Sequence, residues 1–247
     1  MAGKCRVLMM GPDPPPVSVP GAEIVWVPVV RLDLIKGSSL RVLAKLEESD
    51  SIAFTSPRGP RMLREDSEAS LVYGRLKSLM RSRRKAVVGP QTGRALEESF
   101  GLSWDIMPRK YRGEELAEEL VKSGSKKVVI ARSKMGERAI TEVLKRSGVV
   151  FHDIPVYEAT IDWRGVRKAA TLIDNRVIDV IAFTSSTIAR TVCRTLGGSV
   201  PGSSLVIAIG PTTSRAVRME CGVEPVVPEN FNYDYLVKKA VSLCRNA

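Results

Sequence analysis

Histidine, cysteine and amide side chains are scarce in this 247-residue chain. The cysteines form no close pair or CxxC motif, and the only imidazole lies inside an apparent strand, which argues against zinc, dithiol-redox and ordinary hydrolase chemistry. His152 lies in an extended apolar segment, where a structural role is expected. Asn and Gln together number only five, which favours a heat-adapted protein. We expect reduced thiols at all four cysteines, Cys5, Cys193, Cys221 and Cys244.

Long apolar runs and nucleotide-binding loops are also missing. Val7–Met10 is too short for a signal-peptide core, and no uninterrupted apolar stretch approaches the length that spans a bilayer. The Gly-Pro-x-Thr turns lack the spaced glycines and the Lys of a P-loop, and no GxGxxG follows a strand. We therefore expect a soluble cytoplasmic protein with no membrane partner and no bound nucleotide or NAD.

Acidic residues are outnumbered, since 38 Lys and Arg face 27 Asp and Glu and the net charge is +11. This balance favours a polyanionic partner, whether nucleic acid, anionic lipid, or a multiply carboxylated or phosphorylated small molecule. The densest basic run, Arg81–Lys85, contains no aromatic residue, and we expect a solvated helix face or loop there.

The sequence contains an internal duplication. Ile52–Ser56 recurs unchanged as Ile181–Ser185, and Gly89–Ala95 recurs in similar form as Gly210–Ala216, each followed by a glycine at the same distance. Order and spacing agree, which predicts two copies of one fold. A third unit matches Pro108, Tyr111 and Leu116 against Pro228, Phe231 and Leu236.

Each repeated unit has the pattern of strand, turn and helix. Short apolar runs, such as Val128–Ala131, Val177–Phe183 and Leu205–Ile209, precede small polar residues and longer amphipathic segments such as Glu114–Lys122. The predicted fold class is α/β, with two similar parallel-sheet domains of flavodoxin-like or Rossmann-like architecture.

Two extended segments interrupt this pattern and predict a two-stranded linker. Ile24–Leu32 and Phe151–Ile161 each read as a strand that runs through a proline, Pro28 or Pro155. Paired connections of this kind would make the domains discontinuous. The expected bounds are residues 1–31 with 160–247 for the first domain, 34–156 for the second, and about 26–33 and 153–161 for the linker strands.

A proline-rich segment follows the first predicted strand. Gly11–Pro16 contains four prolines, which lack the backbone N–H and fix φ. The helix normally found in a βαβ unit is therefore expected to be absent or very short, with a loop over residues 11–20 in its place.

Hydroxyl side chains follow the predicted strands in both copies, at Thr55–Ser56, Thr92, Thr184–Ser186 and Thr212–Thr213. Ligands of doubly wound sheets bind beyond the carboxyl ends of the strands. Such residues cap the following helices, and capping alone explains any one of them, but the free N–H groups of a first turn also hold carboxylate or phosphate oxygens. Four such turns predict a ligand with several anionic groups, bound in a cleft formed by the two halves.

Several segments together resemble the uroporphyrinogen-III synthase family over nearly the whole chain: Phe54–Gly59, Val88–Leu96, Pro155–Glu158, Phe183–Ser186 and Ile209–Ala216. The resemblance implies the HemD-like fold, two α/β domains joined by a two-stranded linker. It also implies cofactor-free cyclisation of hydroxymethylbilane, an octacarboxylate linear tetrapyrrole, to uroporphyrinogen III. Water is lost and the terminal (D) ring is inverted, as a step of haem, sirohaem or cobalamin biosynthesis.

The resemblance further implies residue roles. Tyr157 matches the family's tyrosine in the Val-Tyr motif and is expected to donate a hydrogen bond or proton to the departing hydroxyl, the alternative being a packed linker aromatic. No metal is implied, and Met9–Gly11 stands where family members often have an arginine. Matching residue by residue gives the expected substrate contacts: Thr55, Ser56, Arg58, Thr92, Arg132, Ser133, Thr184, Ser185, Ser186, Thr212 and Thr213.

The expected partners follow from the same resemblance. The bilane is the substrate, handed over transiently from hydroxymethylbilane synthase to a monomeric enzyme, with no nucleic-acid partner. The alternative is a non-catalytic two-domain ligand sensor or a basic nucleic-acid-binding protein, because the net charge is high and no strong catalytic constellation is present.

Overall fold

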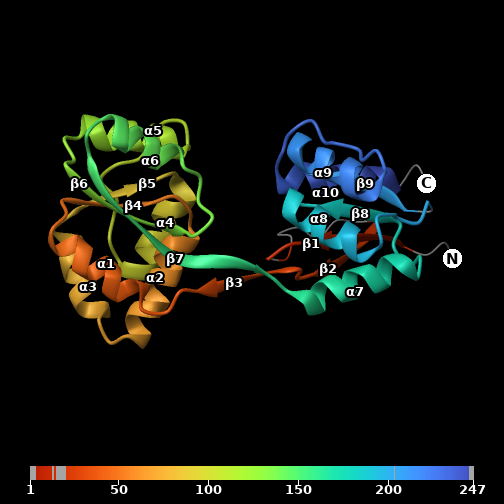
Figure 1. Ribbon diagram of the computed structural model, residues 1–247, viewed down its shortest axis with the longest axis horizontal. Coiled ribbons are helices and arrows are strands. Elements are labelled where there is room, and N and C mark those ends of the chain that lie inside the picture. Colours follow the sequence, from red (N-terminus) through yellow and green to blue (C-terminus); the bar gives the residue numbers. More distant parts are fainter. Residues whose placement is uncertain (1–3, 13, 15–20, 203, 245–247) are drawn as a thin grey trace. The chain divides into compact units, whose positions relative to one another are not determined.

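The computed structural model describes residues 4–12, 14, 21–202 and 204–244. The chain divides into two compact units, Met1–Arg31 with Thr160–Ala247, and Leu32–Ala159 (Figure 1). The first unit is therefore built from both ends of the chain. Each unit has one sheet with helices on both faces. The strand pairs described for the two sheets, β1 with β2 and β8, β8 with β9, β4 with β5 and β6, and β6 with β7, are parallel. The α/β fold class is confirmed.

The first unit contains a four-stranded sheet in the order β2-β1-β8-β9. Helices α7, α8 and α9 pack on one face of this sheet and α10 packs on the other. The strands are β1 (Cys5–Met10), β2 (Ala22–Val27), β8 (Val180–Phe183) and β9 (Leu205–Ala208), and the helices are α7 (Trp163–Asp174), α8 (Ser186–Thr195), α9 (Pro211–Cys221) and α10 (Tyr233–Cys244).

The second unit contains a five-stranded sheet in the order β3-β7-β6-β4-β5. Helices α1 to α4 pack on one face, and α5 and α6 pack on the other. The strands are β3 (Val30–Leu34), β4 (Ser51–Phe54), β5 (Arg84–Val87), β6 (Lys127–Ser133) and β7 (Val150–Ile161). The helices are α1 (Ser38–Glu47), α2 (Arg58–Ala69), α3 (Tyr73–Arg81), α4 (Pro90–Phe100), α5 (Gly113–Lys122) and α6 (Ala139–Arg146).

The repeated strands β4 and β8 lie at equivalent places in the two sheets. Ile52 and Phe54 of β4 pack against α1 to α4, whereas Ala53 packs against α5 and α6. Ile181 and Phe183 of β8 alternate with their neighbours in the same way. Successive side chains of a strand point to opposite faces, so a strand covered on both faces is apolar throughout, as these repeats are.

The two linker segments differ in how they pass their prolines. The chain from Ile24 to Leu32 is broken at Pro28 into β2 and β3, so the predicted single strand is wrong there. β7 runs through Pro155 without a break, and its pairing with β6 shifts register at Arg132 and Ser133. Irregular pairing of this kind accommodates a residue that has no N–H to donate. Both β3 and β7 carry the chain from one unit to the other (Figure 1).

Two sequence expectations are adjusted by the observed elements. The apolar run Val177–Phe183 forms a strand only from Val180 onward, and the helix expected at Glu114–Lys122 begins one residue earlier. The predicted loop over residues 11–20 lies for the most part outside the described residues.

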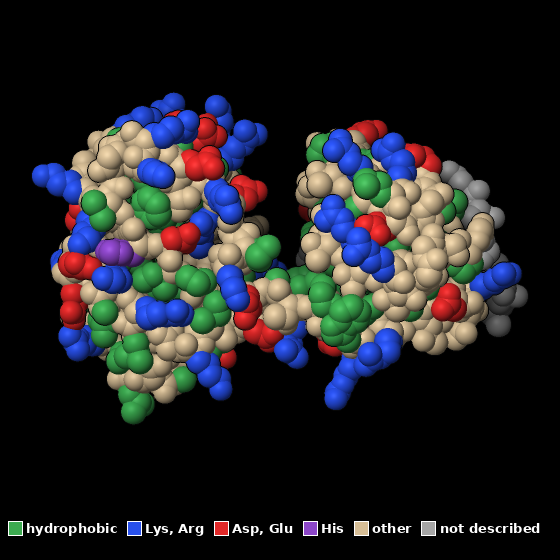
Figure 2. Space-filling view, in the orientation of Figure 1, with side chains coloured by type: hydrophobic (Ala, Val, Ile, Leu, Met, Phe, Trp, Pro, Cys, Tyr) green, Lys and Arg blue, Asp and Glu red, His purple; other side chains and the backbone are tan. Residues whose placement is uncertain are grey.

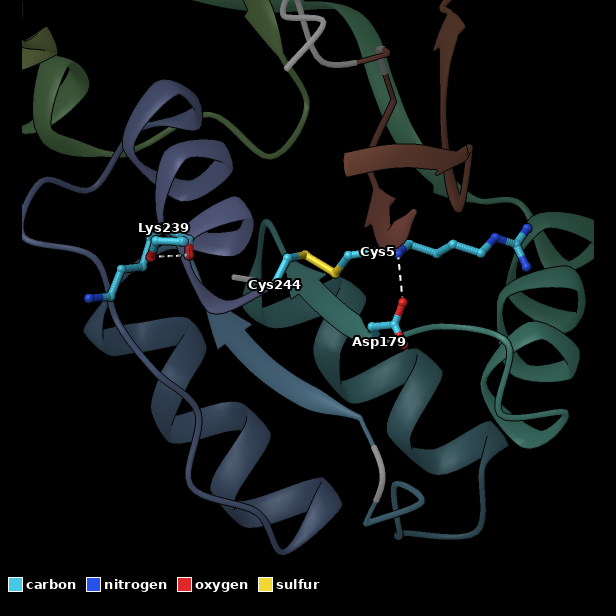
Figure 3. Close-up of a disulfide and its surroundings, with 6 residues drawn as sticks. Cys5, Asp179, Lys239 and Cys244 are labelled. Atoms are coloured by element: carbon cyan, nitrogen blue, oxygen red, sulfur yellow. Dashed lines mark hydrogen bonds between the residues drawn. A yellow bond between two sulfur atoms is a disulfide. The ribbon is translucent and has the colours of Figure 1, made fainter. Parts of the chain in front are cut away.

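All four cysteines form disulfides, so the expectation of reduced thiols is wrong. Cys5 is bonded to Cys244 and Cys193 to Cys221, with Cα atoms 5.7 and 5.1 Å apart. Sequence separations of 239 and 28 residues hid these pairs, because only the fold brings the first residue of β1 to the last residue of α10 and sets α8 against α9. Figure 3 shows the first bond beside Asp179, whose carboxylate accepts from the Arg6 N–H at 2.7 Å.

The basic run is only in part the solvated helix face or loop that was expected, since Arg81, Ser82 and Arg84 are exposed but Arg83 and Lys85 are not. It extends from the last residue of α3 into β5, at the amino ends of the strands. The Arg83 guanidinium donates to the carbonyls of Leu46 and Glu47 at the end of α1, where the helix dipole favours a cation. Lys85 is buried and pairs with Asp105 at 2.8 Å. Elsewhere Lys and Arg are scattered over the face shown in Figure 2, without one dominant patch.

Candidate active site

Two helix starts are nearly superimposable in conformation. Helices α4 and α9 follow the N-cap glycines Gly89 and Gly210, whose φ values of −177° and −171° are extended, and each begins with a proline. Each ends at a left-handed glycine, Gly101 with φ 63° and Gly222 with φ 67°. Neither helix has a side-chain cap among the described residues. The starting proline has no N–H and the Thr92 N–H donates to the Gly89 carbonyl at 3.0 Å, so the N–H groups of Gln91 in α4 and of Thr212 and Thr213 in α9 are those that suit an anion at the carboxyl edge of each sheet.

An exposed aromatic ring lies over each of these N-cap glycines. A Cβ atom at Gly89 would come 3.2 Å from Cγ of Tyr111, and one at Gly210 would come 3.3 Å from Cγ of Phe231. Tyr111 and Phe231 are each 61% exposed, although both are large hydrophobic residues. Each unit thus pairs a helix start that has no side-chain cap among the described residues with an exposed aromatic residue, and the sequence had identified these two aromatics only as markers of the repeat.

The second unit has a cavity of about 580 Å³ at the carboxyl ends of its strands. Its wall includes Thr55 and Ser56 after β4, Arg132 and Ser133 at the end of β6, and Tyr157 on β7. The structure therefore brings five of the sequence-predicted residues of this unit into one cavity. Further lining residues, which the sequence did not identify as site residues, are Tyr111 and Arg112 before α5, and Met135 after β6.

Tyr157 lies at the wall of this cavity and is 6% exposed. Its phenolic oxygen lies 2.8 Å from Oγ of Ser56, and either atom can be the donor. The Tyr157 carbonyl accepts from the Lys134 N–H at 2.9 Å, which fixes the backbone next to the ring. The ring also belongs to the hydrophobic core under α1 to α4. Tyr157 is therefore a packed aromatic that presents a held hydroxyl to a cavity.

Arg132 also lines the cavity, but its guanidinium is already engaged. Nε and Nη2 donate to the two carboxylate oxygens of Asp153 at 2.7 and 2.6 Å, and Nη1 donates to the Glu137 carbonyl. The side chain is buried, and it packs so closely on Gly136 that a Cβ there would lie 2.8 Å from Arg132 Cδ. Arg132 thus holds the loop that follows β6, whereas Arg112 on the same cavity is exposed.

The predicted residues of the first unit lie at the ends of β8 and β9, and several have structural partners. Thr184 donates to the Met10 carbonyl at 2.5 Å, and Ser185 caps α8 by accepting from the Ile188 N–H at 3.2 Å. Ser186 is half-buried in the first turn of α8. In the first turn of α9, Thr212 is exposed and Thr213 is buried.

The remaining predicted residues lie beside the cavity of the second unit. Thr92 is 2% exposed and belongs to the wall of an adjoining hollow of about 470 Å³, which shares Tyr111 with the cavity. Arg58 is the first residue of α2 and is half-buried. His152 is elsewhere, at the amino end of β7, where burial and the charges of Lys45 and Lys127 lower its pKa.

These features define a class of protein. It is a duplicated α/β protein whose paired helix starts, aromatic rings and polar cavity suit a large, multiply anionic ligand. The family model described as "HEM4: Uroporphyrinogen-III synthase HemD" matches residues 18–238, and the chain belongs to that family. The protein is accordingly an enzyme of tetrapyrrole biosynthesis. Enzymes of this family cyclise hydroxymethylbilane, their substrate, to uroporphyrinogen III.

Relatives support this assignment. The uroporphyrinogen-III synthase of Synechococcus elongatus is 27% identical over 161 residues, which are 62% of this chain and 61% of that protein. A Methanocaldococcus jannaschii protein, provisionally assigned the same activity, is 22% identical over 214 residues, 84% of each chain.

Solved structures share the fold. The Helicobacter pylori uroporphyrinogen-III synthetase gives a TM-score of 0.64 at 15% identity, covering 98% of this chain and all of that one. A mutant uroporphyrinogen III synthase from Thermus thermophilus gives 0.58 at 16% identity with the same coverage. Among the described residues, no helix is long and apolar enough to cross a membrane.

Proposed function

We propose that Tyr157 is the general acid of the cyclisation and that the helix starts of both units bind the carboxylates of hydroxymethylbilane. The observation that carries the acid role is the phenol of Tyr157, which is held by Ser56 at the wall of a cavity of about 580 Å³. A positioned proton donor within reach of a leaving group is what departure of a hydroxyl needs.

Loss of water begins the proposed reaction. The bond from carbon to the hydroxyl oxygen breaks, the Tyr157 proton goes to that oxygen, and water leaves. Electron density from the pyrrole nitrogen stabilises the resulting methylene-pyrrole cation. The substituted carbon of the terminal ring attacks it to form a spiro intermediate, which fragments and recloses with that ring inverted. The proton lost in the final closure returns to the Tyr157 oxygen.

Carboxylate binding is assigned mainly to main-chain donors. The first turns of α4 and α9 lack side-chain caps among the described residues, and their N–H groups suit carboxylate oxygens. The hydroxyls at the same helix starts are the secondary contacts, of which Thr212 is exposed and Thr213 is buried. In this proposal the aromatic faces of Tyr111 and Phe231 pack against pyrrole rings.

The acid role is tested by Tyr157→Phe. Incubation with enzymatically generated hydroxymethylbilane, oxidation and separation of isomers measure type III formation against the type I isomer that forms spontaneously. We expect type III formation to fall about 100-fold, the lower end of what general-acid catalysis contributes. Tyr235→Phe, the same change in the first turn of α10, should leave the rate unchanged. An unchanged rate in Tyr157→Phe removes the acid role, and only type I product from the unaltered protein rejects the activity.

We further propose that the enzyme acts as a cytoplasmic monomer, receives the unstable bilane by transient hand-over from hydroxymethylbilane synthase, and does not bind nucleic acid. The basic run Arg81–Lys85 supports the last point, because Arg83 and Lys85 have partners within the protein. Light scattering of the purified protein measures its mass. Salt-sensitive binding to duplex DNA at physiological ionic strength would instead favour the nucleic-acid alternative.

A further inference from the structure

Ser56 and Ser185 occupy the same position in the two copies of the repeat, but their hydroxyls have different partners. Ser185 accepts from the Ile188 N–H at 3.2 Å and caps α8. Ser56 lies 2.8 Å from the Tyr157 hydroxyl, and α2 has no side-chain cap among the described residues. Duplication thus produced one serine that caps a helix and one that holds a tyrosine.

The next residue explains why the two serines diverged. Ser185 has the extended conformation of an N-cap, with φ −158° and ψ 156°, which aims its oxygen at the N–H three residues on. After Ser56 the chain has Pro57 where the other copy has Ser186, and Pro57 itself is the N-cap of α2 with helical φ −60° and ψ −23°. The Gly59 N–H, three residues after Ser56, donates to the Ser56 carbonyl at 3.1 Å and not to the Ser56 hydroxyl, so that hydroxyl is available to Tyr157.

We infer that Ser56 is a positioning residue whose hydroxyl donates its hydrogen bond to the Tyr157 phenolic oxygen. This inference rests on the proposed acid role of Tyr157. A phenol carries one proton. If Ser56 is the donor, that proton is free for an oxygen in the cavity; if Tyr157 were the donor, the phenol would present only lone pairs to the leaving hydroxyl.

Ser56 has a second effect during the reaction. As the phenol gives up its proton, negative charge forms on its oxygen, and a preorganised donor stabilises that charge. Tyr157 is 6% exposed, so little water is near enough to do this. The first unit has no equivalent pair among its described residues, because Val30 follows Pro28–Val29 where Tyr157 follows Pro155–Val156, and because Ser185 caps α8. The arrangement places the acid in one unit only.

The hydrogen bond is tested without substrate. Protein labelled with 13C at the ring carbon that bears the hydroxyl of tyrosine gives an infrared C–O band that reports whether a phenol accepts or donates, and the difference from Tyr157→Phe assigns the band of Tyr157. We expect Ser56→Ala to shift this band, Ser56→Thr to retain it, and the matched control Ser185→Ala to leave it unchanged. A band in Ser56→Ala identical to that of the unaltered protein, or one that reports Tyr157 as the donor to Ser56, overturns the inference.

Turnover tests the consequence. Loss of one hydrogen bond to a developing charge corresponds to about a tenfold fall in kcat with KM nearly unchanged. Ser56→Thr should restore most of the rate, and Ser56→Ala should have no further effect in a Tyr157→Phe background. An equal loss in both backgrounds overturns the positioning role. Failure of the proposed function itself would look different, because the unaltered protein would then give only type I product while the infrared result still stood.

Discussion

Gly165 in the first turn of α7 packs directly on the backbone carbonyl of Pro28. A Cβ atom at Gly165 would lie 1.7 Å from that carbonyl oxygen, far inside any tolerable contact. Beside it, the Asp162 N–H donates to the Val29 carbonyl at 3.0 Å, and the Asp162 side chain caps α7. The segment where the chain leaves the first unit is thus locked to the segment where it returns, and this contact explains why the strand is interrupted at Pro28.

Gly165→Ala should therefore destabilise the first unit. The added methyl group cannot avoid the carbonyl unless α7 moves, which costs about 3 kcal/mol or more in a well-packed region. Gly74→Ala is the matched control, since Gly74 is in α3 and a Cβ atom there would meet no atom within 4 Å; it should be neutral or stabilising by up to about 1 kcal/mol. Urea unfolding followed by circular dichroism measures both, and equal stability of the two variants would refute the contact.

The two disulfides should contribute unequally to stability. In the chain-entropy description the stabilisation grows with the loop that is closed, giving about 5 kcal/mol for Cys5–Cys244, which spans 239 residues, and about 3–4 kcal/mol for Cys193–Cys221, which spans 28. The first bond also joins the two ends of the chain that build the first unit.

Paired substitutions measure this difference without leaving a free thiol. Cys5→Ser with Cys244→Ser should lower the melting temperature more than Cys193→Ser with Cys221→Ser. In the presence of a reductant the unaltered protein should melt at a lower temperature, and its melting temperature and those of the two variants should converge. A reductant-insensitive melting temperature, together with four thiols titrated in the folded protein, would contradict the bonds. Intracellular disulfides are a known feature of hyperthermophile proteins, which agrees with the scarcity of Asn and Gln.

Asp66 should make stability dependent on acid pH. Its buried carboxylate, on α2, accepts from the Gly37 N–H at 2.9 Å and the Ser39 N–H at 2.7 Å and so caps α1 from a neighbouring helix. Burial raises the pKa of Asp66, but the hydrogen bonds from Ser39, Gly37 and Ser38 outweigh it, and the folded pKa lies below the ordinary 3.8. Because the unfolded chain takes up the proton first, the stabilisation is fully present above about 3.8 and is lost as the pH falls through the folded pKa.

Asp66→Asn removes this titration. The variant should be less stable by about 1–2 kcal/mol at pH 7, the usual worth of a helix cap, and the difference should shrink as the pH falls below about 4. Glu65→Gln, a change at the exposed neighbour, should leave the acid limb of the stability curve as it is. Urea titrations from about pH 7 to about pH 2.5 give both curves, and parallel curves for Asp66→Asn and the unaltered protein would rule out the linkage.

Local patterns predicted the duplicated architecture because they are fixed by neighbouring residues. The apolar runs of β4 and β8 indicate buried strands, and the glycines before α4 and α9 indicate the turns into those helices, each within a few positions of the sequence. Contacts between distant segments left no comparable signal. Asp66 caps α1 by accepting from Gly37, 29 residues away, and Cys5 is bonded to a cysteine 239 residues away.

The same limit applies to the candidate site. The sequence identified Tyr157 and Ser56 separately, through a resemblance and a repeat, but not the 2.8 Å contact of their hydroxyls. For Arg132, the sequence predicted a substrate contact but not the ion pair with Asp153 on the neighbouring strand β7, which already binds its guanidinium. Hydroxyl and arginine residues at strand ends therefore predict the location of a candidate site. The hydrogen-bond and ion-pair partners of each residue determine its role in that site.

Arg132 is expected to support the cavity wall without binding a substrate carboxylate directly. Arg132→Ala removes a buried guanidinium from an exposed aspartate and frees the loop after β6, so stability should fall by about 2 kcal/mol and kcat should fall with it. Asp153→Asn separates the two roles. If Arg132 is structural, this variant loses about 1 kcal/mol and its KM does not improve. If the guanidinium instead binds a substrate carboxylate, neutralising Asp153 lowers KM while stability is retained. Steady-state kinetics with hydroxymethylbilane, together with the urea titration, distinguishes these outcomes.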